Sequence, residues 1–412
     1  MKQFSILILV FVFLGCSGQQ KPKEKTQNKV TEEVIKDTKE RKLSGFESHE
    51  LEYLKSPYRG IFTDKGKEND LFPIKSTGVS TRPIVVAAKT FLDGLTADQK
   101  VKTNFPINDQ EWRKWCNVDN GIYTRQGVSI KEMTQAQREL AFNLLKKSLS
   151  AKGLQLSKDI MKTDQTLREL NNDNPIFDEE LYYFTVMGKP SLTEPWGWQI
   201  DGHHLIINYF VLGDQVVMTP TFMGGEPIIT TTGKYKGNTI FQDEQNLGLQ
   251  LMQSLSAKQQ QQAIIRTSKR GHDAKAEAFS DNITLNYEGV KVSELSEKAK
   301  EGLLHLINQY VSNMTDSQAK VKMKDVKTHL DETYFAWVGK TDDAAVFYYR
   351  IHSPVVLIEF DHQGPVGVRS NSRGATRNHI HTVIRTPNGN DYGKDLLKSH
   401  YEKVHKGKQI GS

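Results

Sequence analysis

Beyond residue 80 the sequence repeats itself, and this repetition limits the folds that the chain can adopt. Thr96 and Ser256 open one matched pair of segments, and each is followed three residues later by a glutamine, which is capping-box chemistry for a helix start. The other matches are 127–139 with 289–301, 182–189 with 333–340, 196–201 with 347–352, 205–210 with 356–361 and 215–220 with 381–387. One match alone would be chance. An ordered series at a nearly constant offset indicates an internal duplication.

Each half of this duplication reads as helices followed by a strand and an antiparallel hairpin. We place the halves at about residues 81–235 and 236–412, within a single domain that spans 81–412. Halves of this kind usually pack around a pseudo-twofold axis. The sequence therefore predicts an α+β fold in which the hairpins join into one central antiparallel sheet with helices outside. We expect a functional site where the halves meet.

Residues 1–15 have the pattern of a lipoprotein signal peptide. A positive charge at Lys2 precedes an apolar run from Ile6 to Leu14, which is too short to cross a bilayer as a mature helix. The Leu-Gly-Cys motif that ends at Cys16 resembles a bacterial lipobox, so we expect Cys16 to be lipidated. This predicts a protein anchored to a membrane of the cell envelope, either periplasmic or exposed at the surface. The competing interpretations are an ordinary secretory peptide and a cytosolic tail.

The segments between this signal and the domain have a different composition. Residues 16–45 are rich in Lys, Glu, Gln and Thr and predict a disordered tether, and residues 46–80 predict an irregular lead-in. The net charge of +6 is small for 412 residues and lies partly in the tether. We therefore expect no nucleic-acid partner.

Residues 196–220 read as a strand, a turn at Gly213-Asp214 and a second strand. The apolar run from Leu205 to Ile207 predicts a strand that is buried on both faces. His203 and His204 lie in the middle of this first strand, so we expect their rings to point to opposite faces, with Asn208 on the face of His204. Ionisable rings in such a place need hydrogen-bond partners or a metal.

The duplication provides an internal control, because structural residues should recur in both halves and specialised residues need not. The apolar positions recur. His203 and His204 do not, since the second half has Pro354 and Val355 at the matching positions. The ionisable residues that differ between the halves therefore mark the hairpins as the candidate site.

Two more histidines, His379 and His381, precede the end of the second half. An H-x-H pair on a strand presents two imidazoles on one face and is a common way to bind a cation. If the hairpins meet, His204, Glu359, His379 and His381 would form one cluster. Such a ligand set suits zinc, iron or copper, and an open coordination position would activate water or dioxygen. The alternatives are a polar site without metal and purely structural histidines.

Three further polar residues are candidates for catalytic roles. Asp391 and Glu226 each could reach the mouth of the site from a loop and act as general base. Arg385 lies four residues after His381 on the same strand face and could hold a carboxylate or phosphate; the alternative is a surface salt bridge. The glycines show neither of the two common nucleotide-binding patterns, so we expect no nucleotide cofactor.

The aromatic residues of the first hairpin suggest a substrate pocket. Trp196 and Trp198, together with His203 and Asn208, could line a pocket for a small molecule or a glycan. Aromatic residues on a hairpin are more often part of the core, and that alternative stays open.

Several motifs together resemble the domain-of-unknown-function family 3500, which occurs in bacteria and fungi. The motifs are P-W-G-W-x-x-x-G-H-H-L-x-x-N at 195–208, T-P-x-F-x-G-x-E-P at 219–227, H-x-H-x-x-x-R at 379–385 and N-D-Y-G at 390–393. The resemblance covers roughly residues 80–405. It implies that the four histidines matter, but it implies no activity.

The sequence alone thus favours an exported lipoprotein enzyme with a metal-assisted site between the halves. Hydrolysis is favoured over oxygenation because no redox-specific motif is present. The alternative is a non-catalytic lipoprotein that binds a small molecule or glycan and has structural histidines.

Overall fold

The computed structural model describes residues 43–371 and 373–406. The predicted signal peptide, Cys16 and nearly all of the predicted tether lie outside the described residues. The predicted irregular lead-in contains one helix, α2 (Gly45–Leu54), which the weak apolar pattern of that segment did not indicate. No helix among the described residues has both the length and the apolar character needed to cross a membrane.

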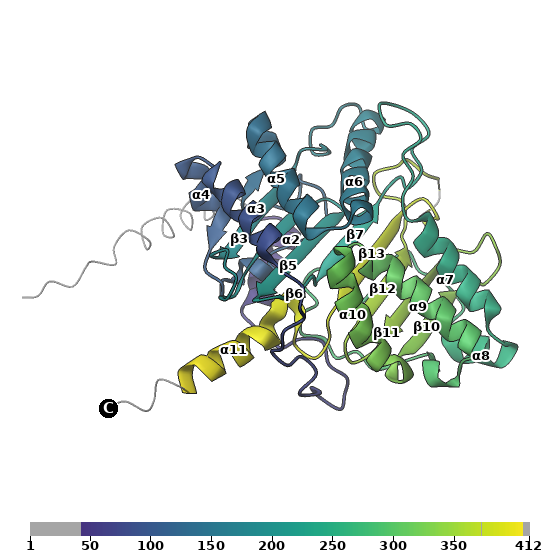
Figure 1. Cartoon of the computed structure of the whole chain (residues 1–412). Helices are drawn as coiled ribbons and strands as arrows, with labels where there is room; N and C mark the ends of the chain where they lie inside the picture. The colour runs from purple at the N-terminus through teal and green to yellow at the C-terminus, as the bar shows by residue number, and fades with distance from the viewer. Residues whose placement is uncertain (1–42, 372, 407–412) are drawn as a thin grey trace, which may run out of the picture. The chain divides into compact units, whose positions relative to one another are not determined.

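A large sheet organises the chain from Gly45 onward (Figure 1). Its ten consecutive strands are β1 (Asn104–Phe105), β3 (Tyr182–Gly188), β4 (Trp196–Gly202), β5 (Leu205–Leu212), β7 (Thr221–Gly225), β13 (Ile380–Arg385), β12 (Leu357–His362), β11 (Phe347–His352), β10 (Tyr334–Gly339) and β8 (Ile264–Arg266). Three short strands pair beside this path: β2 (Val128–Ser129), β6 (Gln215–Val217) and β9 (Val290–Lys291). Neighbours are antiparallel except for the outer pairs β1–β3 and β8–β10.

The described residues contain ten α-helices. After α2 these are α3 (Arg82–Asp93), α4 (Ala97–Thr103), α5 (Gln135–Ser148), α6 (Ala151–Leu170), α7 (Gln242–Ser254), α8 (Ala257–Ala263), α9 (Glu297–Val311), α10 (Asp316–Thr328) and α11 (Lys394–Lys406). Short 3-10 turns are η1 (Gln110–Arg113), η2 (Ile130–Glu132), η3 (Val292–Glu294), η4 (Leu330–Glu332) and η5 (Asp391–Gly393). The predicted capping boxes are confirmed at the starts of α4 and α8.

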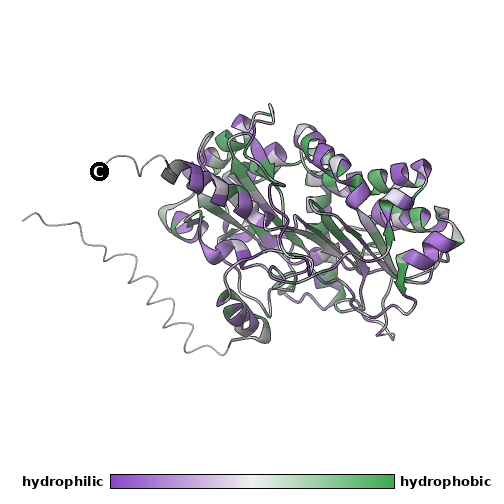
Figure 2. Cartoon of the chain, turned by 90° about the horizontal axis from the view of Figure 1, so that it is seen from below, coloured by the Kyte–Doolittle hydropathy of each residue, from purple (hydrophilic) through white to green (hydrophobic). Residues whose placement is uncertain are grey.

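The sheet is buried on both faces, which explains its apolar strands. Along β5 the residues alternate between two cores: Leu205 and Ile207 pack with helices α3 and α5–α10, whereas Ile206 and Phe210 pack with the lead-in, the segment around η1 and α11. Figures 1 and 2 agree on this layering, with helices over one face and mostly irregular chain over the other. In Figure 2 the helices alternate purple and green, as amphipathic helices should. The prediction of a strand buried on both faces is confirmed.

The strand order is the same on both sides of the central β7–β13 pair. Strands β5, β4, β3 and β1 follow outward on one side, and β12, β11, β10 and β8 follow on the other. All strands of the first group precede residue 226, and all strands of the second group follow residue 263. An α+β fold with a largely antiparallel central sheet is therefore confirmed.

The first hairpin differs from the prediction at its histidines. The Gly213-Asp214 turn is confirmed, because Leu212 pairs with Gln215 across it. However, His203 and His204 are not in mid-strand: they form a second two-residue turn, with Gly202 paired to Leu205. His204 adopts a positive φ of 61°, which histidine tolerates better than most residues. Because histidine is not a usual turn residue, the sequence did not indicate that the chain reverses direction here.

Candidate metal centre

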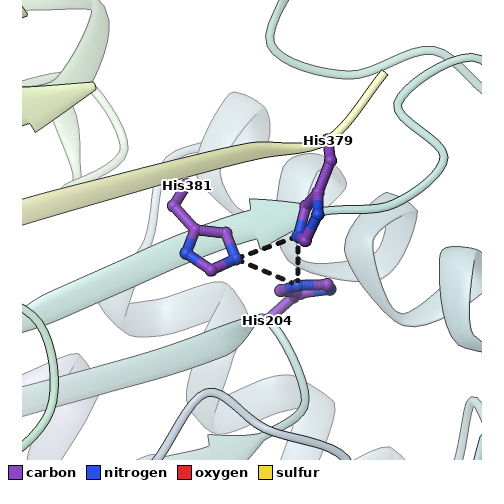
Figure 3. A group of neighbouring side chains, drawn as sticks. All are labelled: His204, His379 and His381. Carbon is purple, nitrogen blue, oxygen red and sulfur yellow. Dashed lines mark hydrogen bonds between the residues drawn. The ribbon is translucent and has the colours of Figure 1, made fainter. Parts of the chain in front are cut away.

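Three histidines converge at one end of the central strands (Figure 3). His204 comes from the β4–β5 turn, His379 immediately precedes β13, and His381 is on β13. Strand β7 lies between their elements, and Gly224 on β7 pairs with His381 and donates its N–H to the carbonyl of His204 over 2.8 Å. A β-carbon on Gly224 would lie 3.2 Å from the His381 ring and 3.3 Å from the His204 ring. The glycine thus leaves room for both imidazoles.

The three Nε2 atoms form a nearly equilateral triangle. Nε2 of His379 lies 3.2 Å from that of His204 and 3.0 Å from that of His381, and the third distance is 3.3 Å. Two imidazole nitrogens bound to one tetrahedral metal at about 2.0–2.1 Å would be about 3.3 Å apart. The triangle therefore has the size that one metal ion requires.

In His379 and His381, the hydrogen bond made by Nδ1 determines that the lone pair is on Nε2. Nδ1 of His379 donates to the carbonyl of Gly364 over 2.7 Å, so its Nε2 is an acceptor. Nδ1 of His381 lies 2.9 Å from Oε1 of Glu277, and donation to that carboxylate again leaves a lone pair on Nε2. Two lone pairs that face each other cannot hydrogen-bond to one another. A cation between them satisfies both.

Burial keeps these rings in the neutral form that binds metals. It lowers the pKa of His379 to about 3 and shifts the pKa of His204 and His381 well below the ordinary value. The charges of neighbouring histidines lower these pKa values further. A protonated ring would be costly here, whereas a neutral imidazole is a ready ligand.

His203 lies against this cluster and has its own orienting group. Its ring stacks on that of His204 with centroids 3.9 Å apart, so the two rings do not point to opposite faces as predicted. Nδ1 of His203 lies 2.5 Å from Oδ1 of buried Asp164 on α6, and the hydroxyl of Tyr182 donates to Oδ2 of Asp164 over 2.7 Å. Nε2 of His203 makes no hydrogen bond among the described residues.

Glu277 and His272 were missed by the sequence analysis. With His381 they form a second group of potential ligands whose atoms lie within 4.8 Å of one another. Both residues are in the irregular segment between β8 and β9, which carries no periodic pattern that could place them. Burial raises the pKa of Glu277 to about 7. Asp164 was missed in the same way, because it is one acidic residue on a long helix.

Glu359 does not join the histidines, contrary to the prediction. On β12 it pairs with Val383, and Asp361 is the residue opposite His381. Its carboxylate accepts hydrogen bonds from the N–H groups of Lys275, at 3.0 Å, and Ala276, at 2.7 Å. Glu359 therefore anchors the segment that carries Glu277. The register between β12 and β13, which the sequence does not reveal, keeps Glu359 away from the histidines.

Glu226 lies behind the cluster. Its Oε2 is 3.8 Å from Nδ1 of His379, but the carboxylate accepts hydrogen bonds from the backbone N–H groups of Val366, Gly367 and Val368, the shortest being 2.6 Å. These bonds tie the β12–β13 connection to the end of β7. The arrangement favours a supporting role over the predicted general base.

Arg385 and Asp391 belong to a separate buried ion network. Nη2 of Arg385 lies 2.9 Å from Oδ1 of Asp281, and its Nε lies 3.5 Å from Oδ2 of Asp391. Arg113 also binds Asp281. Arg385 is four residues from His381 along β13, or about 13 Å at the usual rise of a strand. Arg385, predicted to hold a carboxylate or phosphate, and Asp391, predicted to act as general base, therefore do not reach the histidines.

The other predicted pocket residues are in the interior. Trp196 and Trp198 are completely buried in the core, and Trp198 stacks on Tyr209. The amide of Asn208 joins the side chain of Gln199 to the carbonyl of Pro220. The tryptophans and Asn208 thus belong to the packed interior, and of the four residues only His203 adjoins the histidine cluster.

Fold and cluster together define an α+β protein with a buried three-histidine group that could hold a metal ion. The family described as protein of unknown function (DUF3500) matches residues 77–394, and the chain belongs to that family, as its motifs indicate. No curated protein and no solved structure matches the chain.

Proposed function

We propose that the protein is a metal-dependent enzyme whose zinc, iron or copper ion is held by His204, His379 and His381. The observation that carries this proposal is the triangle of Nε2 atoms, 3.0–3.3 Å apart. In His379 and His381 a hydrogen bond from Nδ1 leaves the lone pair on Nε2, which faces the centre of the triangle. Three imidazole ligands leave a coordination position for a small substrate or water.

Hydrolysis is the reaction class that we favour. A divalent metal with an open position lowers the pKa of a bound water to near neutrality and so supplies a nucleophile. In this chain His203, held by Asp164 and stacked on His204, offers its Nε2 to a substrate beside the metal. Glu277 holds the ring of His381 in place. No redox-specific motif favours the oxygenase alternative.

Hydrolysis of a panel of chromogenic carboxylate and phosphate esters tests this proposal. Protein stripped by a chelator should be inactive, and one of zinc, iron(II) or copper(II) should restore turnover. His204→Ala and His381→Ala should abolish turnover, whereas His400→Ala, far along the chain on α11, should not change it. Oxygen consumption without ester hydrolysis would favour the oxygenase alternative over the hydrolase. A folded protein that binds no metal would favour the non-catalytic binding role.

We further propose that the protein is a lipoprotein anchored to the cell envelope through Cys16. The Leu-Gly-Cys motif after an apolar run supports this. Detergent-phase partitioning of the expressed protein tests it: wild type should enter the detergent phase, and Cys16→Ala should stay in the aqueous phase. Equal partitioning of the two would contradict the anchor.

An internal duplication is our proposal for the origin of the fold. The matched order of strands outward from β7–β13 and the capping boxes of α4 and α8 support it. Under this proposal the metal ligands lie at the seam between the halves, since His204 comes from the first half and His379 and His381 come from the second.

A further inference from the structure

A cavity of about 80 Å³, partly open to solvent, lies toward the other end of β13 from the histidines. Its wall is largely apolar and includes Phe72, Val217, Met218, Val311, Met314 and Ile384. These residues come from the lead-in, from β6 with the residue after it, from α9 with the residues after it, and from β13. The cavity has the apolar lining with a few polar groups that is typical of small-molecule sites, and it shares no residue with the metal centre.

Hydrogen bonds join the segments that form the cavity. The carboxylate of Asp214, in the β5–β6 turn, accepts from the hydroxyl of Ser76 over 2.6 Å and from the N–H groups of Thr77 and Gly78 over 3.0 Å. Gln318 on α10 donates to the carbonyl of Asp214 over 3.4 Å. Lead-in, turn and α10 are thus tied together, so the cavity does not need to be formed by its ligand.

One half-buried cation in the wall, Lys322, makes no ion pair with the described residues. Nζ of Lys322 on α10 donates to the carbonyl of Val355 over 2.8 Å, and within the described part of the chain it forms no ion pair. Asp325, which also lines the cavity, lies 3.9 Å from Nζ of Lys75, and the carboxylates of Asp325 and Asp391 attract the Lys322 ammonium without pairing with it. Burial lowers the pKa of Lys322, because the charged form loses its hydration.

We propose that this cavity binds a small amphipathic carboxylate, with the carboxylate against Nζ of Lys322 and the apolar body against Phe72, Val311 and Met314. Two observations support this occupant. A half-buried ammonium group that lines the cavity and forms no ion pair with the described residues is stabilised by an incoming anion. The apolar wall stabilises a hydrocarbon body by removing it from water. The site is independent of the metal centre.

Decanoate and decanol are matched probes for this proposal, since they share a chain and differ in the charged group. Calorimetric titration of the full chain should show decanoate binding at least about tenfold more tightly than decanol. Lys322→Met should remove this difference, and Lys324→Met, an exposed lysine on the same helix, should keep it. Met314→Trp, which fills the cavity, should lower the affinity for both probes. This variant still tests the proposal if Lys322→Met does not fold.

Three outcomes would overturn the proposal. The first is no decanoate binding below about 1 mM. The second is equal affinity for decanoate and decanol. The third is a folded cavity variant that behaves like wild type, either Lys322→Met with an unchanged preference for decanoate or Met314→Trp with unchanged binding. None of these outcomes depends on metal content or turnover, so failure here is distinguishable from failure of the proposed enzyme.

Discussion

The carboxylate of Glu277 lies 2.9 Å from Nδ1 of His381, on the side of the ring opposite the Nε2 atom that faces His204 and His379. A carboxylate in this position orients a ligating imidazole and increases its basicity. The relationship links an irregular segment between β8 and β9 to the proposed metal centre.

Glu277→Ala should therefore weaken metal binding by about 10–100-fold while leaving the chain folded. The measurement is the dissociation constant for zinc, determined by competition with a chromophoric chelator. Glu301→Ala is the matched control, because Glu301 is exposed on α9. An unchanged zinc affinity in Glu277→Ala would show that the carboxylate does not support the ligand.

Gly224→Ala should disturb the same centre sterically. The new methyl group would lie 2.7 Å from the carbonyl oxygen of Ile380 and between the rings of His204 and His381. Overpacking of this kind costs about 1–3 kcal/mol of stability, and displaced rings should also bind metal more weakly. Gly45→Ala is the control, since nothing lies within 4 Å of its new β-carbon. Thermal unfolding and zinc affinity that match wild type would contradict the prediction.

Arg385→Met should affect stability and leave the metal centre intact. The substitution leaves the buried carboxylates of Asp281 and Asp391 without their shared partner. Loss of one member of a buried ion network costs about 3–5 kcal/mol. Chemical denaturation measures this loss, and metal content per folded chain should stay at the wild-type value. If Arg385→Met kept wild-type stability and lost its metal, Arg385 would instead belong to the metal centre.

The stability of the metal-free protein should fall in acid partly because of His352. Burial lowers the pKa of this ring to about 3, below its ordinary value of 6.5. Between these two pH values the unfolded chain binds the proton and the folded chain does not, so the free energy of unfolding decreases as the pH falls through this window, by up to about 1.4 kcal/mol per pH unit. His352→Phe should reduce this slope in urea denaturation at pH 4–7. An unchanged slope would contradict the assignment.

Local chemistry in the sequence predicted several elements correctly. The capping residues Thr96 and Ser256 open helices α4 and α8, and the Gly213-Asp214 turn separates β5 from β6. These predictions succeed because each depends on neighbouring residues only. The H-x-H pair at the start of β13 depends likewise on strand periodicity, and the structure brings its two rings together.

Features that depend on register or on distant segments were not predictable. His203 and His204 form a turn without any turn residue, so the sequence suggested one long strand. Glu359 was expected beside the histidines, but the register between β12 and β13 places it opposite Val383 and places Asp361 opposite His381. Glu277 reaches His381 from an irregular segment, where no repeating pattern marks a residue's orientation.

Crystals soaked in zinc, and measured on both sides of the zinc absorption edge, test the central claim most directly. The account predicts one anomalous peak within about 2.0–2.2 Å of Nε2 of His204, His379 and His381, with about one zinc per chain by elemental analysis. The peak should vanish in His381→Ala. Less than about 0.1 metal per folded chain after incubation with zinc, iron(II) or copper(II), or a peak bound elsewhere, would contradict it.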